Sequence, residues 1–111
     1  MSWNDCIFCD IAKGQAPAQW VNSWPDAIAI VPLGPVVAGH TLVIPRRHVA
    51  DAASDPETTA ATMRRAAEIA PWPSNIITSI GAPATQTVFH LHVHIVPRAE
   101  GDGLALPWSG R

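Results

Sequence analysis

The segment TVFHLHVHIVPR, residues 87–98, alternates histidines with apolar residues, and this pattern restricts what the segment can form. Side chains on a β-strand point to opposite faces of the sheet with a period of two. One face of the strand therefore holds His90, His92 and His94, and the other holds Phe89, Leu91, Val93 and Ile95. We expect the apolar face to pack on a helix and the imidazoles to open toward a cleft.

A row of imidazoles has two chemical uses. One is a catalytic zinc site with three histidine ligands. Alternate residues on a strand, however, lie about 6.5–7 Å apart, whereas zinc requires each ligand nitrogen at about 2.0–2.1 Å. The other use is a division of labour, because imidazole has a reference pKa of about 6.5 and serves as nucleophile, acid or base near neutrality. The spacing favours distinct roles for the three rings.

The rest of the chain is expected to form short helices and strands, because its eleven prolines interrupt regular secondary structure. Residues 54–70 are the best helix candidate, with capping-box spacing between Ser54 and Glu57 and an apolar stripe. That stripe is Ala60, Met63, Ala67 and Ala70. A shorter helix is expected in residues 5–14, and strands in residues 18–22, 26–35, 39–48, 74–81 and 87–96. This order predicts an α+β fold in one domain, residues 1–111, with an antiparallel sheet of about five strands.

Composition narrows the class of protein. The formal net charge is −2, so the chain lacks the basic surface that duplex nucleic acid requires. No apolar run approaches the ~20 residues of a membrane helix. The first residues, MSWNDCIFCD, do not show the basic and apolar segments of a signal peptide. We therefore expect a cytoplasmic protein with no membrane partner.

The two cysteines, Cys6 and Cys9, have the spacing C-x-x-C. In a cytoplasmic chain this spacing is typical of a metal site or a redox pair. Two buried thiols without a chemical role are the third possibility.

The motif HLHVHIV, residues 90–96, resembles the signature of the histidine triad (HIT) superfamily. CIFCDIAKGQAPA, GHTLVIPRRHV, SNIITSIG and TQTVFHLHVHIVPR follow one another in the order found in that family. The resemblance covers nearly the whole chain, and it is strongest to the zinc-containing, HINT-like bacterial branch. It implies a HIT-like fold with a short N-terminal helix and one longer central helix.

The resemblance also implies a chemistry. Family members are nucleotide-binding hydrolases and transferases that act on the phosphorus nearest the nucleoside. The resemblance implies a phosphoramidase-like hydrolase for this chain. The middle histidine, His92, would form a covalent nucleotidyl intermediate, and His94 would contact the phosphate and protonate the leaving group. Gln86 and Thr87 match a pair beside the phosphate, and Ser79 stands where relatives carry an asparagine that also reaches it.

The same resemblance assigns the cysteines. In the zinc-containing branch, Cys6, Cys9, His48 and His90 would form a closed, structural zinc site with one ion per chain. A slot for the base would be lined by Ile7, Phe8, Ile11, Ile28 and Ile30, although ordinary core packing explains such residues equally well. His40 matches a family histidine near the active site, in either a supporting or a structural role.

Several positions depart from the family pattern. Pro32 replaces an aspartate that holds the ribose, Ser79 is shorter than asparagine, and Thr85 stands where glycine is common. The central helix is also short, because Pro71 and Pro73 follow it at once. Three functions remain: a nucleotide hydrolase, a nucleotide-binding module with little catalysis and a structural zinc, and a metal-binding interaction protein. The family resemblance also implies a homodimer.

Overall fold

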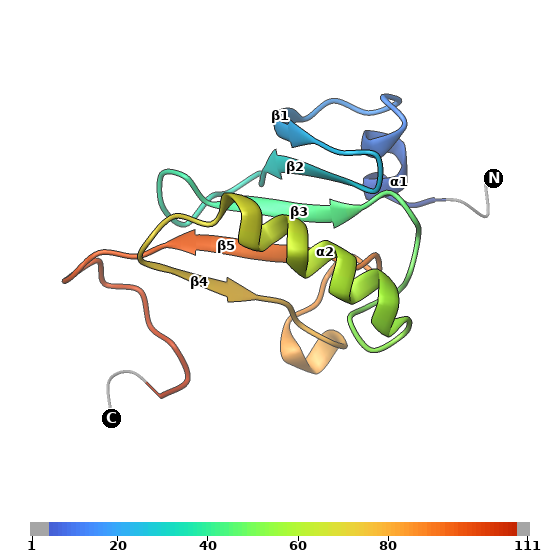
Figure 1. Ribbon diagram of the computed structural model, residues 1–111. Coiled ribbons are helices and arrows are strands. Elements are labelled where there is room, and N and C mark those ends of the chain that lie inside the picture. Colours follow the sequence, from blue (N-terminus) through green and yellow to red (C-terminus); the bar gives the residue numbers. More distant parts are fainter. Residues whose placement is uncertain (1–4, 109–111) are drawn as a thin grey trace.

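The computed structural model describes residues 5–108, which form one antiparallel sheet with a helix on each face (Figure 1). The sheet has five strands in the order β1-β2-β3-β5-β4. Its strands are β1 (Gln19–Ser23), β2 (Ala27–Val31), β3 (Thr41–Pro45), β4 (Ser74–Ile77) and β5 (Val93–Pro97). The helices are α1 (Ile7–Ala12) and α2 (Pro56–Ile69), with a 3-10 turn η1 (Ala82–Ala84) before β5. The predicted α+β fold is confirmed.

Alternation along the strands divides the core into two clusters. On one face α2 contributes Ala66, the segment before β5 contributes Leu91, and the sheet contributes Ala27, Ala29, Val43, Val93 and Ile95. On the other face α1 contributes Phe8 and Ile11, and the sheet contributes Ile28, Ile30, Leu42 and Ile44. His94 pairs with Leu42 across β3 and β5, so its side chain points to the α1 face. The α1 face is therefore the histidine face.

The histidine segment is less regular than predicted, because β5 begins only at Val93. β3 ends at Pro45, which has no N–H to continue the ladder. The preceding residues bond elsewhere: the Leu91 N–H donates to the Val49 carbonyl at 2.8 Å. Side chains still alternate through Leu91, but Phe89 is 54% exposed and does not join the apolar face as predicted.

The central helix also differs from its prediction. Its N-cap is Asp55, and the Ser54 hydroxyl donates to Asp51 at 2.9 Å, so no capping box forms with Glu57. The buried residues are Thr62 and Ala66, whereas Ala60, Met63 and Ala67 of the predicted stripe are exposed. The Thr62 hydroxyl donates to the Thr58 carbonyl at 2.7 Å, which lets a polar residue face the core. In residues 5–108, no helix has the length and apolar character to cross a membrane.

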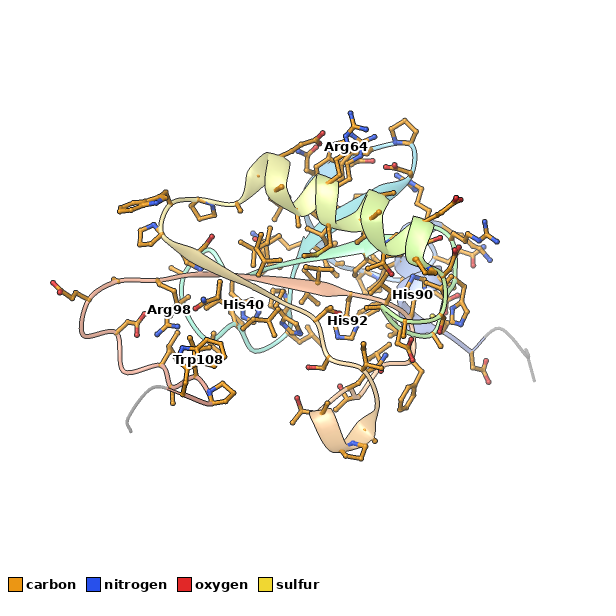
Figure 2. The ribbon with its side chains drawn as sticks, turned by 60° about the horizontal axis from the view of Figure 1, so that its bottom comes forward. His40, Arg64, His90, His92, Arg98 and Trp108 are labelled. Atoms are coloured by element: carbon orange, nitrogen blue, oxygen red, sulfur yellow. The ribbon has the colours of Figure 1, made fainter. Side chains whose placement is uncertain are left out.

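Arginine side chains fix two ends of the fold. Arg98 bonds both oxygens of Asp102, at 2.8 and 3.1 Å, and donates to Leu104 and Asn75. These bonds fold the segment after β5 back toward β4, and Trp108 lies beyond it with 64% of its surface exposed (Figure 2). Arg46 donates to carbonyls of Trp24 and Ala12, and so ties the end of α1 to the β1–β2 turn.

Candidate functional site

A Cys2His2 cluster joins the start of α1 to the histidine segment. The donor atoms of Cys6, Cys9, His48 and His90 all lie within 4.8 Å of one another. His90 Nδ1 is 3.2 Å from the Cys6 Sγ and 3.1 Å from His48 Nδ1. The cluster therefore brings together residues from three distant parts of the sequence, as the family resemblance implied.

His90 is pre-set as a ligand by its surroundings. The side chain is fully buried, and its Nε2–H donates to the Pro45 carbonyl at 2.8 Å. This bond leaves Nδ1 with a free lone pair, and that nitrogen faces the cysteines. Burial lowers the pKa of His90 to about 4, which keeps the ring neutral as metal ligation requires.

The donor set fits zinc in a structural role. Two thiolates and two imidazoles make a closed tetrahedral site, with no position left for a reacting water. Burial and the neighbouring Cys6 raise the pKa of Cys9 to about 11. A bound cation reverses this preference, because the thiolate is the form that binds zinc. Among residues 5–108 the cluster includes neither His92 nor His94, so a catalytic three-histidine zinc site is wrong.

His92 is presented with a free nitrogen. Its Nδ1–H donates to the His90 carbonyl at 2.8 Å, which leaves the lone pair on Nε2. The ring packs edge-on against Phe8 at 5.1 Å between centroids, and the side chain is half-buried. The Thr78 hydroxyl donates to the His92 carbonyl at 2.8 Å and so fixes the backbone. In the view of Figure 2, His92 lies between His90 and His40.

A chain of hydrogen bonds sets the tautomer of His94. The Val36 N–H donates to His40 Nδ1 at 3.1 Å, so His40 carries its proton on Nε2. That proton is donated to His94 Nδ1 at 3.0 Å, and the proton of His94 therefore lies on Nε2. Burial, followed by repulsion from His92 and His40, lowers the pKa of His94 to about 4. His94 is thus a neutral donor beside His92, with 5.3 Å between the ring centroids.

His40 is the residue that sequence reasoning left undecided. It is 5% exposed, and burial lowers its pKa. Its direct contact with His94 gives it a supporting role in the site. The two residues are 54 positions apart, and the pairing of β3 with β5 is what brings them together.

The loop before the histidine segment holds the predicted phosphate residues. Gln86 is 4% exposed, and its Oε1 accepts from the Gly81 N–H at 2.8 Å. Its Nε2 donates to the carbonyls of Ala50 and Val88 at 2.7 and 3.0 Å. Both amide hydrogens are therefore bonded inside the protein, where Gln86 holds the loop together, and the expectation that Gln86 lies beside the phosphate stays a prediction.

Thr85 closes the 3-10 turn with φ of 75°, in the left-handed region that β-branched residues rarely adopt. The loop therefore has the backbone that a glycine would favour, even though threonine occupies the position. Thr87 is exposed and Ser79 is half-buried, so both remain available to a ligand.

The predicted base slot is mostly core. Phe8, Ile11, Ile28 and Ile30 are between 0 and 7% exposed and pack in one cluster. Ile7 differs, because it is 48% exposed and lines an open groove of about 860 Å³. The groove runs past the metal cluster to Thr87 and Phe89, and Lys13 and His48 also line it.

Comparison with known proteins agrees with this geometry. The HIT domain family model matches residues 13–101, which is most of the chain. The chain belongs to the HIT family. The match begins after Cys6 and Cys9 and includes His48 and His90, so two of the four residues of the metal cluster lie outside it.

Several HIT proteins are similar over almost the whole chain. A solved structure of a zinc-bound histidine triad family protein from Mycobacterium smegmatis superposes with a TM-score of 0.85 and 38% identity. The match covers 91% of this chain and 80% of that one. An uncharacterised HIT-like protein of Mycobacterium tuberculosis is 36% identical, over 91% of this chain and 76% of its own length.

A further HIT relative carries a named activity. It is an adenylylsulfatase of Arabidopsis thaliana, 31% identical over 91% of this chain and 56% of its own length. The zinc-bound structure and the cluster in this chain together support one zinc ion as the cofactor of this HIT protein.

Proposed function

We propose that this HIT protein cleaves nucleotides at the phosphorus nearest the nucleoside, through a covalent nucleotidyl intermediate on His92. The observation that carries the proposal is the pair of fixed tautomers. His92 has its lone pair on Nε2, and His94, beside it, has its proton on Nε2. The nucleophile and a hydrogen-bond donor for the leaving group are therefore in place before a substrate binds, which lowers the entropic part of the barrier.

The reaction follows in two displacements. His92 Nε2 attacks the phosphorus, and the bond to the leaving group breaks as that group accepts a hydrogen bond from the neutral His94 Nε2–H and takes up a proton from water. The ring of His92 becomes positively charged, and its Nδ1–H bond to the His90 carbonyl stabilises that charge. Water then attacks the same phosphorus, the bond between phosphorus and His92 Nε2 breaks, and the nucleoside monophosphate and neutral His92 are released as the water gives up a proton to the solvent. The Thr87 hydroxyl is the side-chain donor that we assign to the nonbridging oxygens.

Zinc would be held by Cys6, Cys9, His48 and His90 and would supply a structural crosslink between α1 and the segment that carries His92. The chemical steps belong to the chain's own side chains.

The substrate class that we assign is a nucleoside phosphoramidate or a related nucleotide with a good leaving group. In such a compound, the nitrogen or oxygen atom of the leaving group accepts a hydrogen bond from the Nε2–H of His94, and this bond stabilises the departing group. The adenylylsulfatase among the relatives supports adenylylsulfate as a second substrate, because its leaving group is attached to the same phosphorus.

A second candidate is a nucleotide-binding module with little catalysis. The internal bonds of Gln86 favour it, because they remove two donors from the phosphate site. The proline at position 32 offers no side-chain hydrogen bond to a ribose. For either candidate we propose a homodimer, which light scattering of the purified protein tests.

Turnover of a fluorogenic adenosine phosphoramidate separates the two candidates. Wild type should turn over, and His92→Ala should lose about a thousandfold or more of kcat while it retains its zinc. Titration with adenosine monophosphate is the control, because the variant should still bind that nucleotide. Binding without turnover in wild type would favour the module.

A further inference from the structure

The thiols of the metal cluster are accessible to small molecules. Cys6 and Cys9 are half-buried, His48 is exposed, and all three line the groove of about 860 Å³. His90, in contrast, is fully buried. The cluster thus has one closed side, at His90, and one open side, at the two sulfurs.

The two sulfurs are placed to react with each other. Cys6 is the N-cap residue of α1, and Cys9 lies three positions later, where the two side chains face one another. The Cys9 N–H donates to the Cys6 Sγ at 3.4 Å, and the two Sγ atoms lie within 4.8 Å of each other.

We propose that Cys6 and Cys9 form a peroxide-sensitive pair that closes to a disulfide and thereby releases the zinc ion. One thiolate attacks an oxygen of hydrogen peroxide, the O–O bond breaks, and the hydroxide that leaves takes up a proton to become water. The resulting sulfenic acid is attacked by the second thiolate, which forms the S–S bond and expels a second hydroxide, also protonated to water. Two electrons leave the sulfurs and reduce one peroxide.

Zinc is lost because two of its four ligands are consumed. His48 and His90 remain, and two imidazoles do not complete a structural site. His90 keeps its burial and its bond to the Pro45 carbonyl, so the oxidised protein retains the hydrogen bond from the His92 Nδ1–H to the His90 carbonyl. The pair is therefore a reversible modification site, and its oxidation changes mainly the zinc content and the attachment of α1.

The test follows zinc, thiols and mass in one sample. The zinc-loaded protein is treated with increasing hydrogen peroxide, and free zinc is read with a colorimetric chelator. Each zinc released should accompany the loss of two thiols and of two hydrogen masses, because Cys6 and Cys9 are the chain's two cysteines. Dithiothreitol followed by zinc should restore the starting state. Addition of oxygen atoms without a disulfide, or a disulfide formed while zinc stays bound, would overturn the proposal.

Cys9→His is the matched variant. It keeps four zinc-binding side chains but has no second thiolate to resolve the first oxidation product, so zinc release should be at least about tenfold slower. Release at the wild-type rate would contradict the proposal. If this variant does not take up zinc, the ratio of zinc to disulfide in wild type decides the question alone.

Discussion

His40 Nε2 lies 3.0 Å from Nδ1 of His94, and this contact determines which nitrogen of His94 carries the proton. The tautomer of His40 is itself fixed by the Val36 N–H, which donates to His40 Nδ1. A backbone group therefore sets the tautomer of His40, and His40 sets that of His94. A buried residue outside the triad thereby acts as a positioning residue for His94, the proposed hydrogen-bond donor to the leaving group.

Replacing His40 should therefore lower kcat more than it raises KM. In His40→Phe, His94 loses its donor and samples both tautomers, and we expect kcat to fall about tenfold or more. His40→Gln retains an N–H donor and should recover part of the loss. The ring ¹⁵N shifts of His94 report its tautomer directly. Unchanged shifts in His40→Phe would show that the contact does not set the tautomer.

Acid should destabilise the protein through His94. Its folded pKa of about 4 lies below the reference value of 6.5, so between these values the unfolded chain binds more protons than the folded one. Stability is therefore lost as the pH falls from about 6.5 to about 4. The difference corresponds to roughly 3 kcal/mol at about 1.4 kcal/mol per pH unit, as an upper limit.

The pH effect is measured by urea unfolding of wild type and His94→Asn across that range. Zinc loss at low pH affects both proteins, so the difference between them isolates His94. The variant should show the smaller loss of stability. Equal slopes for the two proteins, or a ring of His94 that titrates near 6.5 by NMR, would refute this account.

The left-handed backbone at Thr85 predicts a stabilising substitution. Thr85→Gly should raise the free energy of unfolding by about 1 kcal/mol, because glycine adopts φ of 75° without a steric cost. Thr85→Ala is the matched control, since it shortens the side chain but keeps a Cβ. It should gain much less. Chemical denaturation of the three proteins gives the comparison, and a loss of stability in the glycine variant would show that the threonine is not strained.

Thr78 should support His92 through its hydroxyl. Thr78→Val keeps the shape and removes the donor to the His92 carbonyl, so we expect a cost of about 1 kcal/mol in stability and a fall of several-fold in kcat. Thr78→Ser retains the hydroxyl and should restore kcat. A valine variant that loses stability but keeps the wild-type kcat would limit Thr78 to a structural role.

Local patterns in the sequence predicted the architecture, and the family resemblance predicted the metal ligands. Alternation through the histidine segment separated the two faces, and the positions of Cys6, Cys9, His48 and His90 matched a known family pattern. Helix α2 was located to within two residues at its start, although its buried side was not. Thr62 faces the core by bonding its own helix, and apolar periodicity cannot predict that.

The support of the triad could not be predicted for a different reason. The contact of His40 with His94 depends on the register of β3 against β5, and the bonds of Gln86 depend on the path of residues 49–50. Both are tertiary relationships between segments far apart in the sequence. The β3–β5 ladder ends at the pair of Val43 with Val93, where the histidine strand begins. The proline at position 45 was a visible signal, because it has no N–H with which to continue the pairing.

The covalent step on His92 is tested most directly by intact mass spectrometry during a single turnover. Zinc-loaded protein is mixed with a limiting amount of adenosine phosphoramidate and quenched within the first turnover in alkaline denaturant, which preserves phosphorus–histidine bonds. The account predicts a transient species heavier by one adenylyl group, mapped by fragmentation to His92 and missing in His92→Ala. Full turnover by His92→Ala, or an adenylyl group found on another residue, would contradict it.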